Sequence, residues 1–108
     1  MSNKILITNA FSLNMLQAFA STIITEELTI PQVKETIAGG FESGMGHSTE
    51  LVSAILGMDI PMNRITNKIQ DGESILVAQY VGPRLAEGAT ELPEGATLKF
   101  IKVTVIYG

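Results

Sequence analysis

The sequence predicts a compact α/β domain of mixed α+β type, with a mixed, mostly five-stranded sheet flanked by helices. Three observations predict it. A length of 108 residues suits a single domain spanning residues 1–108. A hydrophobic content of 45% against 17% charged residues is sufficient to bury a core. Short β-branched segments alternate with segments of helical periodicity, which is typical of strands interleaved with helices.

The chain begins with a predicted strand, a short helix and a second strand. Residues 4–8 are short, apolar and β-branched, which predicts a buried strand. A short helix carrying Met15, Leu16 and Phe19 is expected next, with a polar residue from the preceding turn as its cap. Residues 21–25 read as the second strand.

A longer helix has clear boundary signals. Thr29 can act as its N-cap, Pro31 suits the first turn and Gln32 completes a capping box. Gly39 and Gly40 are expected to end the helix, because glycine adopts the left-handed cap conformation at little cost.

The middle of the chain is expected to hold a loop and a third helix. Residues 41–47 are punctuated by glycine and predict a loop. Ser48 or Thr49 can cap the helix that follows, and Gly57 would end it. Residues 60–63 form a connector.

The last part of the chain predicts strands and one long loop. Residues 64–69 alternate in polarity as a half-buried strand does, and the Asp-Gly pair at 71–72 predicts a hairpin turn into a partner strand over 74–80. Residues 82–96 contain prolines and glycines and predict a long loop. Residues 97–107 predict the final strand.

Charge and composition exclude several classes of function. Seven Lys and Arg against eleven Asp and Glu give a net charge of −4, so the chain lacks the basic excess of a protein that binds long nucleic acids. With no cysteine and one histidine, the chain cannot build a disulfide, a zinc ribbon, an iron–sulfur cluster or a multi-histidine metal site. A magnesium site made of carboxylates stays open, although no motif predicts one. We expect neither a metal nor a cofactor.

The sequence also carries no signal for a membrane. Its first residues, Met-Ser-Asn-Lys, lack the apolar segment of a signal peptide, and no apolar run approaches the ~20 residues of a membrane span. We therefore expect a cytoplasmic protein without a membrane partner.

His47 is the main candidate for catalysis, because histidine is the side chain that ordinarily exchanges protons near neutral pH. It follows Gly46 and directly precedes a predicted helix N-terminus, where backbone N–H groups and the helix dipole favour an anion. A phosphate bound there would lie beside the imidazole. The alternative is a loop histidine without a function.

Two further groups are candidates for ligand binding. Arg84, in the long loop after a strand, can hold a phosphate through the forked donors of its guanidinium, unless it is only a solvated arginine. Asn9, Ser12 and Asn14 follow the first strand, at the end of a sheet where ligands commonly bind, although the same residue types are favoured as helix caps.

Four segments of the chain resemble a known family when taken together in order. They are NAFSLNML at 9–16, the Gly-His pair at 46–47 with the following helix, IPMNR at 60–64 and GPRLAEG at 82–88. They resemble the small viral and bacterial ring nucleases, whose viral members are type III anti-CRISPR proteins that degrade cyclic tetra-adenylate.

The resemblance implies a symmetric homodimer that binds cyclic tetra-adenylate across its interface, with one active site per subunit. It assigns catalysis to His47 and Glu87. It assigns ligand binding to Asn9, Ser12, Asn14, Gly46, Arg64 and Arg84. The implied chemistry needs no metal, because RNA carries its own nucleophile in the 2′-OH. Two other classes of function stay open: a module that binds the cyclic nucleotide without cutting it, and a structural or regulatory protein whose partner is another protein.

Overall fold

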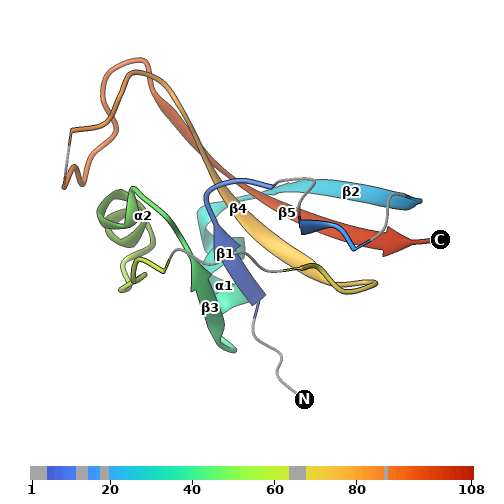
Figure 1. Ribbon diagram of the computed structural model, residues 1–108. Helices are drawn as coiled ribbons and strands as arrows, with labels where there is room; N and C mark the ends of the chain where they lie inside the picture. The colour runs from blue at the N-terminus through green and yellow to red at the C-terminus, as the bar shows by residue number, and fades with distance from the viewer. Residues whose placement is uncertain (1–4, 12–14, 18–19, 64–67, 87) are drawn as a thin grey trace.

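Five strands form one mixed sheet in the computed structural model, which describes residues 5–11, 15–17, 20–63, 68–86 and 88–108. The strands are β1 (Ile5–Thr8), β2 (Ser21–Leu28), β3 (Phe41–Gly44), β4 (Ser74–Val81) and β5 (Thr97–Tyr107), in the spatial order β2-β5-β4-β1-β3 (Figure 1). Strand β1 is parallel to both β3 and β4, whereas β5 is antiparallel to β2 and β4. The predicted mixed five-stranded sheet with flanking helices is therefore confirmed.

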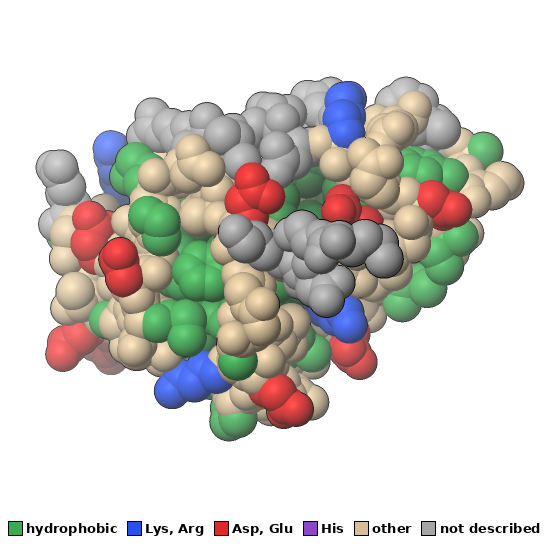
Figure 2. Space-filling view, turned by 90° about the horizontal axis from the view of Figure 1, so that it is seen from below, with side chains coloured by type: hydrophobic (Ala, Val, Ile, Leu, Met, Phe, Trp, Pro, Cys, Tyr) green, Lys and Arg blue, Asp and Glu red, His purple; other side chains and the backbone are tan. Residues whose placement is uncertain are grey.

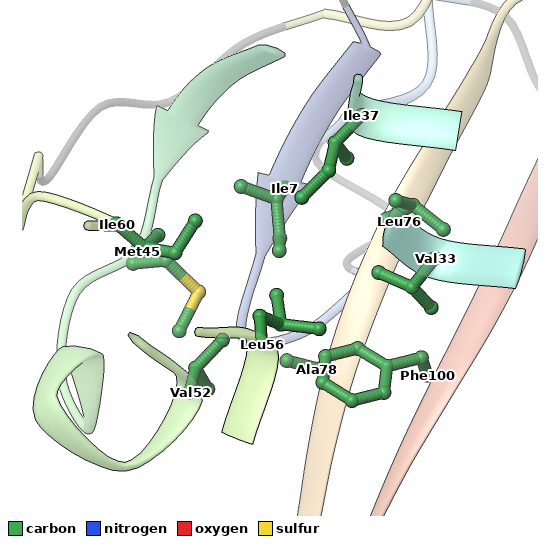
Figure 3. Packing of buried hydrophobic residues seen from close by; sticks show 10 residues of the cluster. All are labelled: Ile7, Val33, Ile37, Met45, Val52, Leu56, Ile60, Leu76, Ala78 and Phe100. Carbon is green, nitrogen blue, oxygen red and sulfur yellow. The ribbon is translucent and has the colours of Figure 1, made fainter. Parts of the chain in front are cut away.

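The main core lies between this sheet and two helices, α1 (Ile30–Ile37) and α2 (Thr49–Leu56). Successive side chains of a strand point to opposite faces, so alternate residues of β1, β4 and β5 face the helices. Figure 3 shows this cluster, whose members are each at most 2% exposed: Ile7, Val33, Ile37, Met45, Val52, Leu56, Ile60, Leu76, Ala78 and Phe100. Burial of each large aliphatic side chain contributes about 1.5–3 kcal/mol.

Helix α1 begins at the capping box that the sequence predicts. The Thr29 hydroxyl accepts a hydrogen bond from the Gln32 backbone N–H at 3.3 Å, and the side-chain amide oxygen (Oε1) of Gln32 accepts one from the Thr29 backbone N–H at 2.8 Å. Val33 and Ile37 bury the apolar side of the helix. None of the helices in the described parts of the chain has the length and apolar character needed to cross a membrane.

The opposite face of the sheet is covered by irregular segments instead of helices. Leu16 forms an isolated parallel bridge with Ile69, whose N–H donates to the Met15 carbonyl at 2.8 Å. The three side chains pack in a second buried cluster with Leu6, Ile75, Val77, Val103 and Val105. Met15 is in a 3₁₀-helical conformation, as the expected short helix requires, but Leu16 forms the bridge instead, so the helix does not continue through Leu16 as expected. Phe19 lies outside the described residues.

Strand β3 lies where the sequence predicts a loop. It pairs in parallel with β1 along its four residues. Because β3 is an edge strand with one neighbour, it tolerates the polar Ser43 and a glycine. These residues interrupt the apolar pattern by which a strand is predicted from sequence. A Cβ atom on Gly44 would lie 3.0 Å from Cδ1 of Leu6, so the glycine also leaves room for the neighbouring strand.

The hairpin expected between residues 64–69 and 74–80 is wrong. Residues 71–72 do form a turn, but both edges of β4 are occupied by β1 and β5. Of the expected strand, residues 64–67 lie outside the described residues, and Ile69 bridges to Leu16 instead. The turn thus leads directly into β4, which is the central strand of the sheet.

Strand β2 continues three residues beyond the predicted end. It pairs with β5 from Ser21 to Leu28, past the expected end at Thr25. Glu26 and Glu27, which lie beyond the predicted end, remain in solvent on this edge strand, where the Glu27 carboxylate lies 3.7 Å from the Lys99 ammonium. Charged side chains on an exposed edge are compatible with a strand.

Candidate functional site

Three parallel strands end at the same edge of the sheet. Because β1, β3 and β4 are adjacent and parallel, the segments that follow them emerge together. Asn9 follows β1, residues 45–47 follow β3, and residues 82–96 follow β4. The described residues of the last segment, 82–86 and 88–96, form an arm that extends beyond the sheet on the side of α2 (Figure 1). Ligands of sheets with parallel strands commonly bind at this edge.

A hollow of about 1090 Å³ opens between the start of α2 and the first half of the arm. Its volume exceeds the ~300–1,000 Å³ of an ordinary small-molecule pocket. The hollow contains both His47 and Arg84, so two of the residues predicted for the site share it. The described lining residues are His47, Ser48, Glu50, Met62, Tyr80, Gly82, Arg84, Leu85, Ala86, Gly88 and Ala89.

The backbone that carries His47 is bound to the end of β1 by one side chain. The Asn9 carboxamide oxygen accepts from the N–H of Gly46 at 2.7 Å and from the N–H of His47 at 3.2 Å. The Asn9 amide nitrogen donates to the carbonyl oxygen of His47 at 3.1 Å. Asn9, predicted to contact a ligand, therefore contacts the histidine loop.

The His47 ring is held by its neighbour in the sequence. Its Nδ1 lies 2.9 Å from the Ser48 hydroxyl oxygen. Ser48 precedes α2 with φ of 58° and makes no side-chain cap to that helix. Helix α2 thus begins at the predicted position, but the serine side chain bonds to the imidazole instead of a helix amide.

The arm is narrow at its base, where Gly82 and Ala96 approach each other. A Cβ atom on Gly82 would lie 2.6 Å from the Ala96 Cβ and 2.8 Å from its Cα, inside any normal contact. The Tyr80 hydroxyl donates to the Pro83 carbonyl, which fixes the chain as it leaves β4. These contacts set the direction in which the arm carries Arg84.

The charges at the hollow are few. Among its described lining residues Arg84 is the one cation of fixed charge and Glu50 the one carboxylate, and both are exposed. The start of α2 adds the partial positive charge of a helix N-terminus. On the face of the molecule drawn in Figure 2, Lys and Arg side chains are scattered among acidic ones and form no stripe.

The remaining predicted residues fall in two groups. Gly46 lies between Asn9 and His47 and donates its N–H to Asn9. Four others lie outside the described residues: Ser12, Asn14, Arg64 and Glu87.

A second, smaller hollow of about 300 Å³ lies on the sheet face opposite the helices. Asn9 lines it together with Gln79, whose side chain alternates with that of Tyr80 along β4 and so points away from the His47 hollow. Gln79 therefore does not share the hollow that holds His47.

Several lining residues were not predicted from the sequence. The sequence predicts Ser48 as a helix cap and Met62 as part of a connector, and it gives no signal for Glu50 at the site. Tyr80 carried a usable signal, because it is a polar ring on the face of β4 that otherwise presents Leu76 and Ala78. The rest of the lining comes from the arm, whose path depends on the strands at its base.

No group of three or more His, Asp or Glu side chains within the described residues is placed to hold a metal ion. The absence of a metal from the chemistry remains a prediction.

Fold and site together define a small α+β protein with a histidine and an arginine at the carboxyl ends of parallel strands. The STIV B116-like family model matches residues 5–102, so the chain belongs to this viral protein family. Among curated proteins, none matches the chain.

The chain is also similar to a solved viral structure, B116 of Sulfolobus turreted icosahedral virus, with 27% sequence identity and a TM-score of 0.76. The match covers 93% of this chain and 97% of the viral protein, so the two agree over the whole domain and not in one motif.

Proposed function

We propose that this protein is a metal-independent ring nuclease. It binds cyclic tetra-adenylate across a homodimer interface and cleaves it to linear di-adenylate that carries a 2′,3′-cyclic phosphate, thereby switching off type III CRISPR signalling. The observation that carries the proposal is that His47 and Arg84, from loops after different strands, line one hollow. Membership of a viral protein family is consistent with a protein that acts against a host defence.

The proposed reaction uses the ribose 2′-OH as nucleophile. The 2′-hydroxyl gives its proton to solvent water while its oxygen attacks the adjacent phosphorus in line, and the bond from phosphorus to the 5′-oxygen breaks. The departing 5′-oxygen needs a proton, which His47 supplies from Nε2, because Ser48 engages Nδ1. General acid catalysis of this kind contributes about 10²–10⁴-fold. The phosphate ends as a 2′,3′-cyclic diester.

Arg84 acts on the charge of the phosphate. Its guanidinium offers forked, charge-assisted hydrogen bonds to phosphate oxygens, and these strengthen as negative charge gathers on the oxygens in the transition state. Glu87 is proposed to orient the 2′-OH or Arg84; that role rests on the resemblance alone, since Glu87 lies outside the described residues.

A homodimer matches the symmetry of the ligand. A ring of four identical nucleotides has a twofold axis, which suits an interface made by the same surface of two subunits. Each subunit then brings one His47 to one of two opposite phosphates, and two cuts give two di-adenylates. One histidine in each chain is sufficient for this reaction.

The test incubates the purified protein with cyclic tetra-adenylate and excess EDTA and follows the products by mass spectrometry, with cyclic hexa-adenylate in parallel. Di-adenylate bearing a cyclic phosphate is the expected product. The variant H47A should lose about 10²–10⁴-fold in rate and keep its affinity. The matched control is E35Q, on the exposed side of α1, which should behave as wild type.

The other outcomes identify the alternatives. An intact ring that binds tightly, with H47A unchanged in affinity, would indicate a module that sequesters the nucleotide. No binding at all would indicate a protein whose partner is another protein. A protein that binds the ring should be stabilised by about 2.7 kcal/mol at 100 times the dissociation constant, whereas a protein whose partner is another protein should show no stabilisation.

A further inference from the structure

We infer that Asn9 is a positioning residue, which fixes the backbone of the His47 loop and so holds the imidazole in the hollow. The inference rests on the proposed function of His47. It assigns to Asn9 an action through another residue, which differs from the direct ligand contact that the resemblance implies.

The geometry is that of a two-sided clamp. One carboxamide oxygen accepts two consecutive backbone N–H groups, those of Gly46 and His47, at 2.7 and 3.2 Å. The amide nitrogen of the same side chain donates to the His47 carbonyl at 3.1 Å. Both peptide groups that flank the His47 Cα are therefore bound to Asn9. If either peptide group changed its orientation, at least one of its hydrogen bonds to Asn9 would break.

The clamp is mounted on a rigid part of the fold. Asn9 follows Thr8, which is buried in β1 and whose hydroxyl donates to the Gly44 carbonyl at 3.2 Å. On the other side of the loop, the Asn63 amide donates to the Ser43 carbonyl at 2.8 Å. The segment from β3 to His47 is thus tied on both sides before α2 begins.

Only asparagine among residues of this size combines the acceptor and the donor that the clamp uses. Two N–H groups already occupy the two lone-pair directions of the Asn9 oxygen. A ligand could bond to that oxygen only by displacing a loop amide. The main effect of a substitution should therefore pass through His47.

The first experiment needs no ligand. Amide hydrogen exchange, measured by NMR on the free protein, should show protected amides at Gly46 and His47. In the variant N9A these two amides should exchange about 10-fold faster or more. Local opening of the loop costs less free energy there, because the hydrogen bonds to Asn9 are already missing. N9D keeps the acceptor, so it should retain most of the protection, and it is available if N9A does not fold.

The matched control is Q17A. It removes one amide-to-carbonyl hydrogen bond, from Gln17 to Ile69 at 3.2 Å, at the opposite end of the sheet. It should leave exchange at Gly46 and His47 unchanged. Wild-type amides that exchange as freely as those of an open loop would overturn the inference.

The second experiment is a double-mutant cycle with cyclic tetra-adenylate under single-turnover conditions. N9A should slow cleavage about 10-fold or more, because a displaced general acid is a poor one, while the dissociation constant stays within a few-fold. In the H47A background the same substitution should change the rate less than about 2-fold.

Equal losses in both backgrounds, or a loss confined to affinity, would overturn the inference and make Asn9 a ligand contact. A wild-type protein that does not cleave the ring would refute the proposed function instead. Amide exchange would then still decide whether Asn9 holds the loop.

Discussion

Ser48 occupies a backbone conformation that few residues other than glycine adopt. Its φ of 58° lies in the left-handed region, which costs a residue with a Cβ atom about 1–2 kcal/mol. The hydroxyl does not cap α2, and it lies 2.9 Å from Nδ1 of His47. The turn therefore brings the hydroxyl to the imidazole and settles which ring nitrogen is engaged.

Replacing Ser48 separates these two roles. In S48G the backbone strain is relieved, but the unfolded chain gains a similar freedom, so the free energy of unfolding should change by less than about 1 kcal/mol. Cleavage of cyclic tetra-adenylate should slow about 10-fold, because the imidazole loses its orienting partner. Thermal unfolding and single-turnover rates measure the two effects. S48N, which tolerates the same conformation and has a polar side chain, is the control, and an unchanged rate in S48G would show that the hydroxyl is not needed.

Arg84 should affect binding and cleavage together. A guanidinium on a phosphate acts in the ground state and in the transition state, so R84A should weaken binding of cyclic tetra-adenylate and slow its cleavage in the same variant. Titration calorimetry in the H47A background gives the affinity, and single-turnover kinetics give the rate. K34A, which removes an exposed lysine from α1, is the control for loss of one positive charge. Wild-type affinity in R84A would refute the phosphate contact.

The arm is the element whose geometry the site depends on most. Any side chain at Gly82 would overlap with Ala96, so G82V should push the two sides of the arm apart and move Arg84 away from His47. We expect cleavage to fall about 10²-fold, since misplacement by ~1 Å is sufficient for a loss of this size. The sheet itself should survive, because the substitution lies beyond the β4–β5 pairs.

Two controls separate the arm from general destabilisation. G39A lies where nothing is within 4 Å of the added methyl group, so it should leave the activity unchanged. T29A removes the capping box of α1 and should cost about 1 kcal/mol of stability without slowing cleavage. Far-UV circular dichroism checks the fold of each variant, and a G82V protein with wild-type activity would contradict this dependence on the arm.

At the level of elements, the sequence predicts the helices and strands whose boundaries are specified by residues close together in the chain. The capping box at Thr29, the glycine after α2 and the long β5 are each specified by residues close together in the chain. Strand β3 was missed because four residues beside a glycine-rich loop become a strand only when β1 lies beside them. The bridge between Leu16 and Ile69 was missed for the same reason.

The candidate site divides in the same way. His47 and Arg84 could be named from their chemistry and from motifs, and the structure brings them into one hollow. The role of Asn9 could not be predicted, because an asparagine in a sequence can equally be a helix cap, a ligand contact or a residue that clamps the backbone. Only the adjacency of β1 and β3 brings its carboxamide to His47.

For the whole molecule, the proposal predicts a dimer with two independent cutting sites. The mass in solution should be twice that of the 11.6 kDa chain, as sedimentation equilibrium would show. In a mixed dimer of one wild-type and one H47A subunit, only one of two opposite phosphates can be cut at once. Linear tetra-adenylate should then accumulate before di-adenylate, as quenched time points resolve by mass spectrometry. A mixed dimer that releases di-adenylate without this intermediate would contradict one site per subunit.

The pairing of β2 with β5 also has a kinetic consequence. Its register joins Ser21 to Tyr107, so this part of the sheet closes across most of the chain. Domains dominated by such distant contacts fold in milliseconds to seconds, far more slowly than helical bundles of equal size. Until β5 adds to the sheet, β2 lacks its partner and the arm is tethered at β4 alone. We therefore expect the hollow to be completed late in folding, after the helices and the parallel strands have formed.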